Sequence, residues 1–380
     1  MNRYNVPRDF LRQKNKAITA RLLIAAMCLI PGVLFAVEQM PSNSVAFEDP
    51  LDHSAKSQTH LQDRPLMAVT TAGQKLIAVG MRGLVIVSDD NGLHWRQARV
   101  PVQSDLLAVM FPTANKGWAV GHDGTILHSQ DGGETWILQL DGRAAEHQFV
   151  PFYQARADQG DSRAQAIVEG LKINFRSGPS LPYLSVWFEN ESVGYAVGSF
   201  GSIVATTDGG KHWLPWYERI ENPEGLNLNG IYGVGAELLI VGEQGHVFKL
   251  DRDTRQFRSI RTGYEGSFFS VLGNDEVLVA FGLRGKFFRS TDHGETWSAG
   301  VLPATSTIAS GAALANGGGF VMVNAAGQLL LADPGATQVR VASARKAMRL
   351  TAVAPLPGNQ VVVAGLRGIG LEPLPSLSSR

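Results

Sequence analysis

The sequence holds a single cysteine, Cys28, among its 380 residues. Cys28 lies in an apolar N-terminal segment, so the rest of the chain can form neither disulfides nor a thiolate metal site. Histidines are also few, nine in all, and none of their spacings matches a metal-ligand motif. A triple glycine at 317–319 precedes an expected strand rather than a helix, which argues against a phosphate loop. We therefore expect no metal, no cofactor and no catalytic residue.

The chain also lacks an excess of charge of either sign, because 34 Lys and Arg balance 34 Asp and Glu. Residues 1–36 hold six of the basic residues and one of the acidic residues. The remainder of the chain is therefore mildly acidic, and no general affinity for nucleic acid is expected.

The apolar run from Leu22 to Val37 is short for a membrane span and contains the helix-breaking pair Pro31-Gly32. Basic residues precede it, and a small residue, Ala36, offers a cleavage position. Residues 1–36 are therefore interpreted as a signal peptide, with an uncleaved anchor as the alternative. Export of this kind predicts the periplasm of a Gram-negative bacterium, or the thylakoid lumen in a photosynthetic organism.

Glycine, in contrast, is plentiful, with 42 residues, and much of it falls in one eight-residue pattern that occurs four times. The pattern begins with Ser or Thr, has Asp at its third position and Gly at its fifth, and ends in Trp. An Asp can accept hydrogen bonds from downstream backbone N–H groups, and Gly permits the positive φ of a tight turn. We expect these Asp residues to hold the turns and the Trp rings to pack between sheets. The residues concerned are Asp90, Trp95, Asp131, Trp136, Asp208, Trp213, Asp292 and Trp297.

A larger repeat surrounds these turns. Each copy has an apolar strand, a second strand that ends in Gly, a third strand, the Asp turn and a fourth strand. The aligned second-strand ends are Gly80, Gly121, Gly198, Gly242, Gly282, Asn324 and Gly365. Their period is about 41 residues, with one interval longer by about 36. Seven such units predict an all-β fold, a seven-bladed β-propeller with Asp-box repeats.

The domain organisation is set by this alignment. Residues 37–65 form an extension that closes the ring, and residues 66–375 form the propeller. The seventh repeat supplies only three strands, so we expect a segment around Val45 to Phe47 to add the fourth. An insertion at residues 141–182 separates the second and third blades. Residues 161–174 within it predict a short amphipathic helix with Ala164, Ile167, Val168 and Leu171 on one face.

Turns between second and third strands lie on the face opposite the Asp turns. Three of them carry arginine: Arg82, Arg284 and Arg367. Guanidinium groups brought together by the ring would bind a carboxylate or an acidic peptide through charge-assisted hydrogen bonds. The alternative is that each Arg is a solvated turn residue. A His122–Asp123 acid–base pair on this face is the weaker candidate, because a polar turn accounts for both residues.

The eight-residue copies are Asp boxes, which also occur in sialidases, but a sialidase would carry an Arg-Ile-Pro sequence that is missing here. The run from Ala119 to Trp136, the seven repeats, the export signal and the three Arg-Gly turns together resemble the photosystem II assembly/stability factor family. That resemblance implies a lumenal propeller without enzymatic activity that binds a newly made membrane-protein subunit. It also implies that Arg82, Arg284 and Arg367 belong to the partner-binding patch. The insertion and the sixth repeat, which lacks the Arg, depart from the family pattern.

The sequence therefore predicts an exported, monomeric, non-catalytic propeller that binds a membrane or envelope protein, through an acidic or carboxylate-bearing segment of that partner. Two alternatives remain open. An Asp-box carbohydrate-active enzyme would need paired carboxylates on the Arg face, for which Asp123, Glu243 and Glu265 are the available acids. An accessory subunit of an envelope transporter would be a variant of the main prediction.

Overall fold

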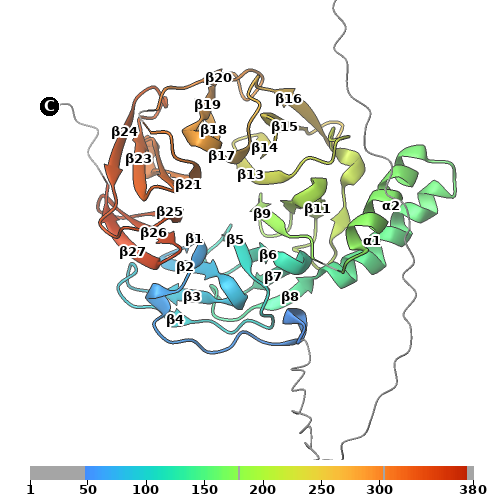
Figure 1. Cartoon of the computed structure of the whole chain (residues 1–380), viewed down its shortest axis with the longest axis horizontal. Helices are drawn as coiled ribbons and strands as arrows, with labels where there is room; N and C mark the ends of the chain where they lie inside the picture. The colour runs from blue at the N-terminus through green and yellow to red at the C-terminus, as the bar shows by residue number, and fades with distance from the viewer. Residues whose placement is uncertain (1–47, 179, 303, 375–380) are drawn as a thin grey trace, which may run out of the picture. The chain divides into compact units, whose positions relative to one another are not determined.

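The computed structural model describes residues 48–374 with the exception of 179 and 303. Strands arise where β-branched and aromatic residues alternate with smaller ones, and every strand pair is antiparallel with a short connection. The described residues form seven sheets, six with four strands and the last with three. In each sheet the strands succeed one another in chain order. Figure 1 shows these sheets arranged as the blades of a ring, so the expected seven-bladed β-propeller is confirmed.

Each of the first four blades has four strands. Blade one comprises β1 (Leu66–Ala72), β2 (Lys75–Gly80), β3 (Val85–Ser88) and β4 (Arg96–Gln97). Blade two comprises β5 (Leu106–Met110), β6 (Gly117–Gly121), β7 (Ile126–Ser129) and β8 (Ile137–Leu140). Blade three comprises β9 (Tyr183–Phe188), β10 (Gly194–Gly198), β11 (Ile203–Thr206) and β12 (Leu214–Pro215). Blade four comprises β13 (Leu228–Val234), β14 (Glu237–Gly242), β15 (His246–Asp251) and β16 (Gln256–Arg261).

The last three blades complete the ring. Blade five comprises β17 (Phe268–Gly273), β18 (Leu278–Gly282), β19 (Phe287–Ser290) and β20 (Ser298–Ala299). Blade six comprises β21 (Ile308–Ala313), β22 (Phe320–Asn324), β23 (Gln328–Ala332) and β24 (Val339–Ser343). Blade seven comprises β25 (Leu350–Leu356), β26 (Gln360–Gly365) and β27 (Gly368–Pro373). Each second strand ends at the Gly or Asn used to align the repeats. The fourth strands after the four Asp boxes begin one residue beyond the Trp, because that Trp still belongs to the turn.

The hydrophobic core is divided into seven clusters, one between each pair of neighbouring blades. The inner strands β1, β5, β9, β13, β17, β21 and β25 pack against one another around the ring. One cluster joins blade seven to blade one, with Ala352 and Val362 against Val69 and Ile86. The hydroxyl of Thr351 also donates to the carbonyl of Leu66 at 2.7 Å. Side-chain packing therefore continues across the point where the chain's first and last blades meet.

The predicted fourth strand of blade seven, around residues 45–47, lies outside the described residues. The part of the N-terminal extension that is described runs along the outer edge of blade one. Ala55 N–H donates to the carbonyl of Val100 at 3.0 Å, and Gln103 N–H donates to that of Pro50 at 2.8 Å. The ring-closing role of residues 37–65 stays a prediction.

The insertion between blades two and three contains two helices, α1 (Gly142–Ala157) and α2 (Ser162–Phe175). The sequence predicted only the second. Figure 1 shows them side by side at the outer rim of the ring. Among the described residues, no helix is both long and apolar enough to cross a membrane.

Candidate functional site

The turns between second and third strands lie against the links that connect one blade to the next. The backbone N–H of Leu283 donates to Ser267 O at 2.9 Å, and that of Leu366 donates to Arg349 O at 3.1 Å. In blade two, His122 N–H donates to Asp105 O at 2.9 Å. These recurrent bonds place the turns and the blade-to-blade links on one face of the ring, which we call the Arg face.

These turns share a left-handed backbone conformation that requires glycine at one position and accepts different residues at the position before it. Arg82 and Arg284 have φ of 57° and 56°, and the glycines that come after them have φ of 69° and 67°. A Cβ on Gly83 would lie 2.1 Å from the carbonyl of Val102, so no larger residue fits there without displacing the backbone. The same left-handed conformation occurs at Asp123, Phe200 and Gln244 in blades two, three and four. The turn therefore holds its shape whichever side chain it presents.

Arg367 departs from this geometry. It lies with Leu366 in a tight turn directly between β26 and β27, and the positive φ falls on Gly368, at 102°. The chain packs closely here as well, because a Cβ on Gly368 would lie 1.8 Å from the carbonyl of Gln62. Blade seven thus presents its Arg from the equivalent turn but with a different backbone conformation.

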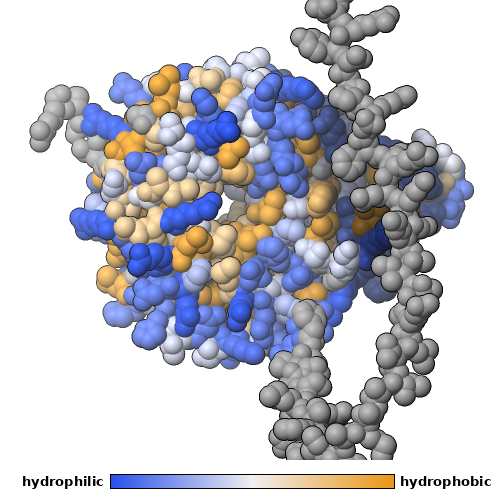
Figure 2. Space-filling view, viewed as in Figure 1, coloured by the Kyte–Doolittle hydropathy of each residue, from blue (hydrophilic) through white to orange (hydrophobic). Residues whose placement is uncertain are grey.

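All three arginines are exposed, and within the part of the chain that the structure describes none of their guanidinium groups forms a hydrogen bond or ion pair. Each comes directly after an exposed apolar residue: Met81 is 46 % exposed, Leu283 36 % and Leu366 42 %. These three turns therefore offer an apolar side chain beside a cation with open donors. Figure 2 shows one side of the ring, with polar surface and separate apolar areas around a central hollow.

Near Arg284, the hydroxyl of Tyr264 donates to the carbonyl of Leu283 at 3.0 Å. Burial raises the pKa of Tyr264, and the neighbouring Arg284 opposes that shift. Tyr264 also lines a cavity of 450 Å³ with Gln244, Arg261 and Glu265. A second cavity of this face, of 460 Å³, is lined by Met81 and Arg82 themselves.

The weaker candidate, His122 with Asp123, has a different arrangement. Asp123 accepts a hydrogen bond from the hydroxyl of Ser104 at 2.7 Å, and among the described residues it forms no hydrogen bond with His122. Glu243, another acid of this face, accepts from the backbone N–H of Asn227 at 2.9 Å. These bonds tie both carboxylates to the links between blades.

The Asp boxes share one hydrogen-bond pattern on the opposite face. In blade five, Asp292 accepts from the hydroxyl of Ser290 at 2.7 Å and from the N–H of Thr296 at 2.9 Å. The indole N–H of Trp297 donates to the carbonyl of Gly294 at 3.0 Å. Hydrogen bonds from Thr296 are the main cause that lowers the pKa of Asp292 to about 2. The carboxylate therefore organises the turn in its ionised form.

The other three boxes repeat this geometry with small changes. Hydrogen bonds from His94 lower the pKa of Asp90 to about 2, and hydrogen bonds from His212 outweigh burial to lower that of Asp208 to about 2. In blade two, Thr135 N–H donates to Asp131 at 3.0 Å. The indole of Trp213 donates to Gln139 instead of to its own turn.

Two further Asp turns escaped detection from the sequence. Asp333 of blade six accepts from the N–H and the hydroxyl of Thr337 at 2.8 and 2.9 Å. Asp251 of blade four accepts from the N–H of Thr254 at 3.0 Å. The eight-residue pattern missed both because the initial Ser or Thr and the final Trp are absent from them.

The helical insertion is anchored by polar contacts as well as by its apolar face. Asp141 caps α1 by accepting from Ala144 N–H at 2.8 Å, and Asp161 caps α2 by accepting from Ala164 N–H at 2.9 Å. The hydroxyl of Tyr153 donates to Glu218, and burial is the main cause that raises the pKa of that hydroxyl. Glu218 belongs to the segment after β12, so this bond ties α1 to blade three.

The insertion adjoins the Arg face. A Cβ on Gly124, in the blade-two turn, would lie 2.8 Å from the backbone nitrogen of Gly142 at the start of α1. On blade three, a guanidinium nitrogen of Arg163 donates to the carbonyl of Ile220 at 3.1 Å. Ile220 belongs to the link between blades three and four. Both helices therefore meet structures of the Arg face.

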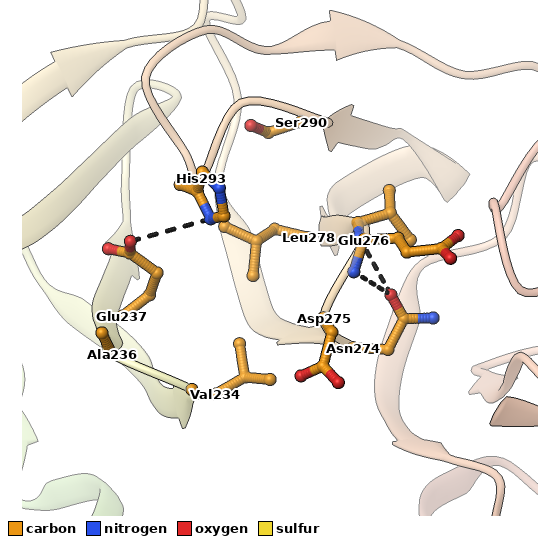
Figure 3. A pocket seen from close by; sticks show the side chains of 11 residues that line it. Val234, Ala236, Glu237, Asn274, Asp275, Glu276, Leu278, Ser290 and His293 are labelled. Carbon is orange, nitrogen blue, oxygen red and sulfur yellow. Dashed lines mark hydrogen bonds and ion pairs between the residues drawn. The ribbon is translucent and has the colours of Figure 1, made fainter. Parts of the chain in front are cut away.

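The Asp-turn face has a smaller cavity, of 190 Å³, between blades four and five. Figure 3 shows Val234 and Leu278 within it and His293 facing Glu237, 3.9 Å apart. Glu237 is also paired with Lys249 at 3.0 Å. In the described residues, no group of three or more His, Cys, Asp or Glu side chains could hold a metal ion. The ion pairs with Lys249 and His293 give Glu237 a structural role.

Comparison with known proteins agrees with this architecture. The family model described as "Photosynthesis system II assembly factor YCF48" matches residues 87–152 and 169–367. "Photosystem II assembly protein Ycf48" of Synechococcus sp. (strain JA-3-3Ab) is 29% identical over 167 residues, which cover 41% of this chain and 49% of that protein. "Photosystem II assembly lipoprotein Ycf48" of Synechococcus sp. (strain CC9902) is 29% identical over 187 residues, covering 48% and 56%. The matched region thus spans about half the length of these relatives.

A solved structure described as "YCF48 bound to D1 peptide" superposes with a TM-score of 0.59 and 15% identity, covering 83% of this chain and 95% of that one. At this identity the superposition supports the fold. The family assignment rests on the sequence match, which takes in 265 residues of the chain, counted from the two matched ranges. The chain therefore belongs to the family of the photosynthesis system II assembly factor YCF48.

Proposed function

We propose that this protein is an exported, non-catalytic assembly factor that binds a segment of a membrane protein and assists the assembly or stability of its complex. Relatives in the family are named as photosystem II assembly proteins, and one solved relative is described as bound to a D1 peptide. The observation that carries the proposal for this chain is the Arg face, where three repeats present an exposed guanidinium beside an exposed apolar side chain.

The chemistry of the Arg face favours an acidic or carboxylate-bearing segment. Arg82, Arg284 and Arg367 keep open donors, and a guanidinium binds a carboxylate through two parallel hydrogen bonds. Apolar side chains of the partner segment could pack against the exposed residues beside these arginines, which are Met81, Leu283 and Leu366. A partner segment that alternates acidic and apolar residues would match both features.

The proposed location is the periplasm, or the thylakoid lumen in a photosynthetic organism. The sequence pattern of residues 1–36 supports export, and one relative is named a lipoprotein. Those residues lie outside the described part of the chain. We further propose that the protein acts as a monomer and binds no nucleic acid, in keeping with its mildly acidic composition.

The test is partner capture by a variant in which Arg82, Arg284 and Arg367 are all changed to Ala. We expect wild-type protein to retain a membrane protein from detergent-solubilised membranes of its own organism, and the triple variant to lose it. Retention by wild type should fall as salt rises, since screening weakens the attraction between exposed charges. Thermal stability should stay nearly unchanged, because exposed turn charges contribute little to folding.

Two control variants separate charge from turn geometry. Gln244→Ala alters an equivalent turn without removing a charge, and Lys211→Ala removes a positive charge from an Asp turn on the opposite face. Both should capture the partner as wild type does. If the triple variant captures the same membrane protein with the same salt dependence, the Arg face is ordinary surface and the proposed site is wrong.

A further inference from the structure

A cavity of 440 Å³ opens where the helical insertion meets the Arg face. Its walls come from α2, from the turn between β10 and β11, and from the link between blades three and four. Apolar surface is supplied by Ile167, Phe200, Tyr217, Ile220 and Pro223. Apolar walls with a few polar groups, in a volume of this order, are typical of ligand sites. We call this cavity the hairpin pocket.

Helix α2 presents two parallel stripes. Ala164, Val168, Leu171 and Phe175 are buried in the core between blades two and three. The adjacent stripe, with Arg163, Ile167, Gly170 and Asn174 at intervals of four, three and four residues, lines the hairpin pocket. A Cβ on Gly170 would meet no heavy atom within 4 Å. Packing therefore does not require glycine here, and its absent side chain leaves the pocket wall open.

Phe200 forms the facing wall. It occupies the position of blade three that holds Arg82 in blade one and Arg284 in blade five, with φ of 52°. Its N–H donates to the side-chain oxygen of Asn227 at 2.8 Å, which fixes the turn, while the ring is 58 % exposed. An exposed phenyl ring at an Arg-face position places an apolar contact among the cationic ones.

The rim of the hairpin pocket carries one open cation. Arg163 uses a single guanidinium nitrogen for the bond to Ile220 O, and in the described residues its other donors have no partner. The side chain of Asn222 is instead occupied within the link between blades three and four. It donates to Leu226 O at 2.9 Å and accepts from Leu226 N–H at 3.0 Å. Glu221 also lines the pocket, and its carboxylate accepts a hydrogen bond from the backbone N–H of Ser259 at 2.8 Å. The open donors of Arg163 are thus suited to a carboxylate, while the walls are suited to an apolar side chain.

We propose that the hairpin pocket receives a large apolar side chain, aromatic or aliphatic, from the partner's acidic segment, with Arg163 contacting a carboxylate beside it. This inference rests on the proposed function and adds a specificity determinant to the Arg face. The family model leaves out residues 153–168, which include Arg163 and Ile167. The family match therefore omits the first half of the pocket's helical wall, whereas Gly170 and Asn174 fall within it.

The test uses two fluorescent peptides of alternating Glu and Ser, one with a central Phe and the other with Ala in its place. Binding to the full mature protein is measured by anisotropy. Burial of a Phe side chain should tighten binding of the Phe peptide by roughly ten-fold or more over the Ala peptide. Gly170→Leu fills the pocket while raising helix propensity, and Phe200→Ala removes an exposed wall, so neither variant should unfold the ring.

Both variants should bind the two peptides with nearly equal affinity, whereas Gln165→Leu, which adds the same side chain to α2 away from the pocket, should keep the preference for Phe. Suppose that wild type binds the two peptides equally and that the triple Arg variant binds neither. This result would refute the proposed role of the hairpin pocket while supporting that of the Arg face. Binding that survives in the triple Arg variant would overturn the Arg face. If the Phe preference persists in Gly170→Leu, the pocket is not its source.

Discussion

The change of Trp136 to Ala tests whether the Asp-box tryptophans hold neighbouring blades together. Trp136 is 4 % exposed and lies in the cluster between blades one and two, with Val79, Val87 and Leu127. Its ring meets Phe111 edge to face with centroids 5.8 Å apart, and its N–H donates to Gly133 O at 2.9 Å. The substitution therefore removes burial, an aromatic contact and a hydrogen bond together.

The expected loss is about 3–5 kcal/mol in the free energy of unfolding, the range for large aromatic residues truncated in a core. An estimate from the surface area that the Trp side chain buries gives a similar loss of unfolding free energy. A buried aromatic removes about 150–250 Å² from water, and about 25 cal/mol per Å² gives roughly 4–6 kcal/mol as an upper bound. The backbone carbonyl of Gly133 also loses its donor, so relaxation around the cavity would recover only part of this loss.

Trp297 provides the matched control. It makes the same indole bond to its own turn, to Gly294 O at 3.0 Å, but its ring is only half-buried. Urea unfolding followed by fluorescence and by circular dichroism should give a lower midpoint at unchanged slope for both variants. Trp136→Ala should lose more than Trp297→Ala. A loss under about 1 kcal/mol at Trp136, or an equal loss at both positions, would refute the reasoning, because burial would not set the cost.

Other contacts give three more predictions. Deleting residues 37–60 should lower the thermal midpoint and promote aggregation, because blade one loses hydrogen bonds along its edge; an unchanged midpoint would contradict this. The pKa of Asp292 is about 2 in the folded state and about 3.9 when unfolded, so its contribution to stability is present above pH 4 and lost between pH 4 and 2. Asp292→Asn should flatten that part of the thermal midpoint's pH profile, and a profile identical to wild type would exclude this role. Glu218→Gln should speed hydrogen exchange in α1 without affecting the inner strands, because Tyr153 loses a charged acceptor; equal exchange would show that apolar packing alone holds the helix.

The sequence predicted the ring because its signals are local and repeated. A Gly that ends a strand, such as Gly80 or Gly282, sits where a Cβ would lie within about 2.3 Å of a backbone carbonyl, Pro65 O or Ser267 O respectively. The fold therefore favours glycine at this point of the repeat, which six of the seven repeats have and which is Asn324 in the sixth, and the spacing of these positions counts the blades. The Asp boxes could be recognised for the same reason, since the hydrogen bonds that their Asp carboxylates accept span only a few residues.

Helix α1 was missed because Pro151 lies in its middle and a proline normally argues against a helix interior. The signal that could have found it is the spacing of Ala145, Phe149 and Tyr153, all buried at intervals of four residues. The apolar contact that these residues make with the core offsets the lost backbone hydrogen bond. The pattern was present, but it was weaker than the proline that interrupts it.

The Arg face could be predicted in part. Topology alone puts Arg82, Arg284 and Arg367 in turns on one face, but the Arg-Gly pair is the same in all three turns and gives no sign that Arg367 has a different backbone conformation. The hairpin pocket could not be predicted, because it joins Phe200 to Gly170 through the packing of α2. Nothing in the local sequence of either residue indicates the other.

The helical insertion shares its core with the ring. Phe149, Tyr153 and Val168 belong to the same cluster as Trp118 and Val186 of blades two and three. An insertion without such a shared core could be removed as an appendage, but excision of this one would uncover the apolar wall between two blades. If a partner side chain occupies the hairpin pocket as proposed, it would contact the helix whose other face fills the interface between blades two and three, so binding should stabilise that part of the ring. Among the described residues, this is the inter-blade cluster to which helices contribute, so the proposed recognition site and the packing of two blades would share one helix.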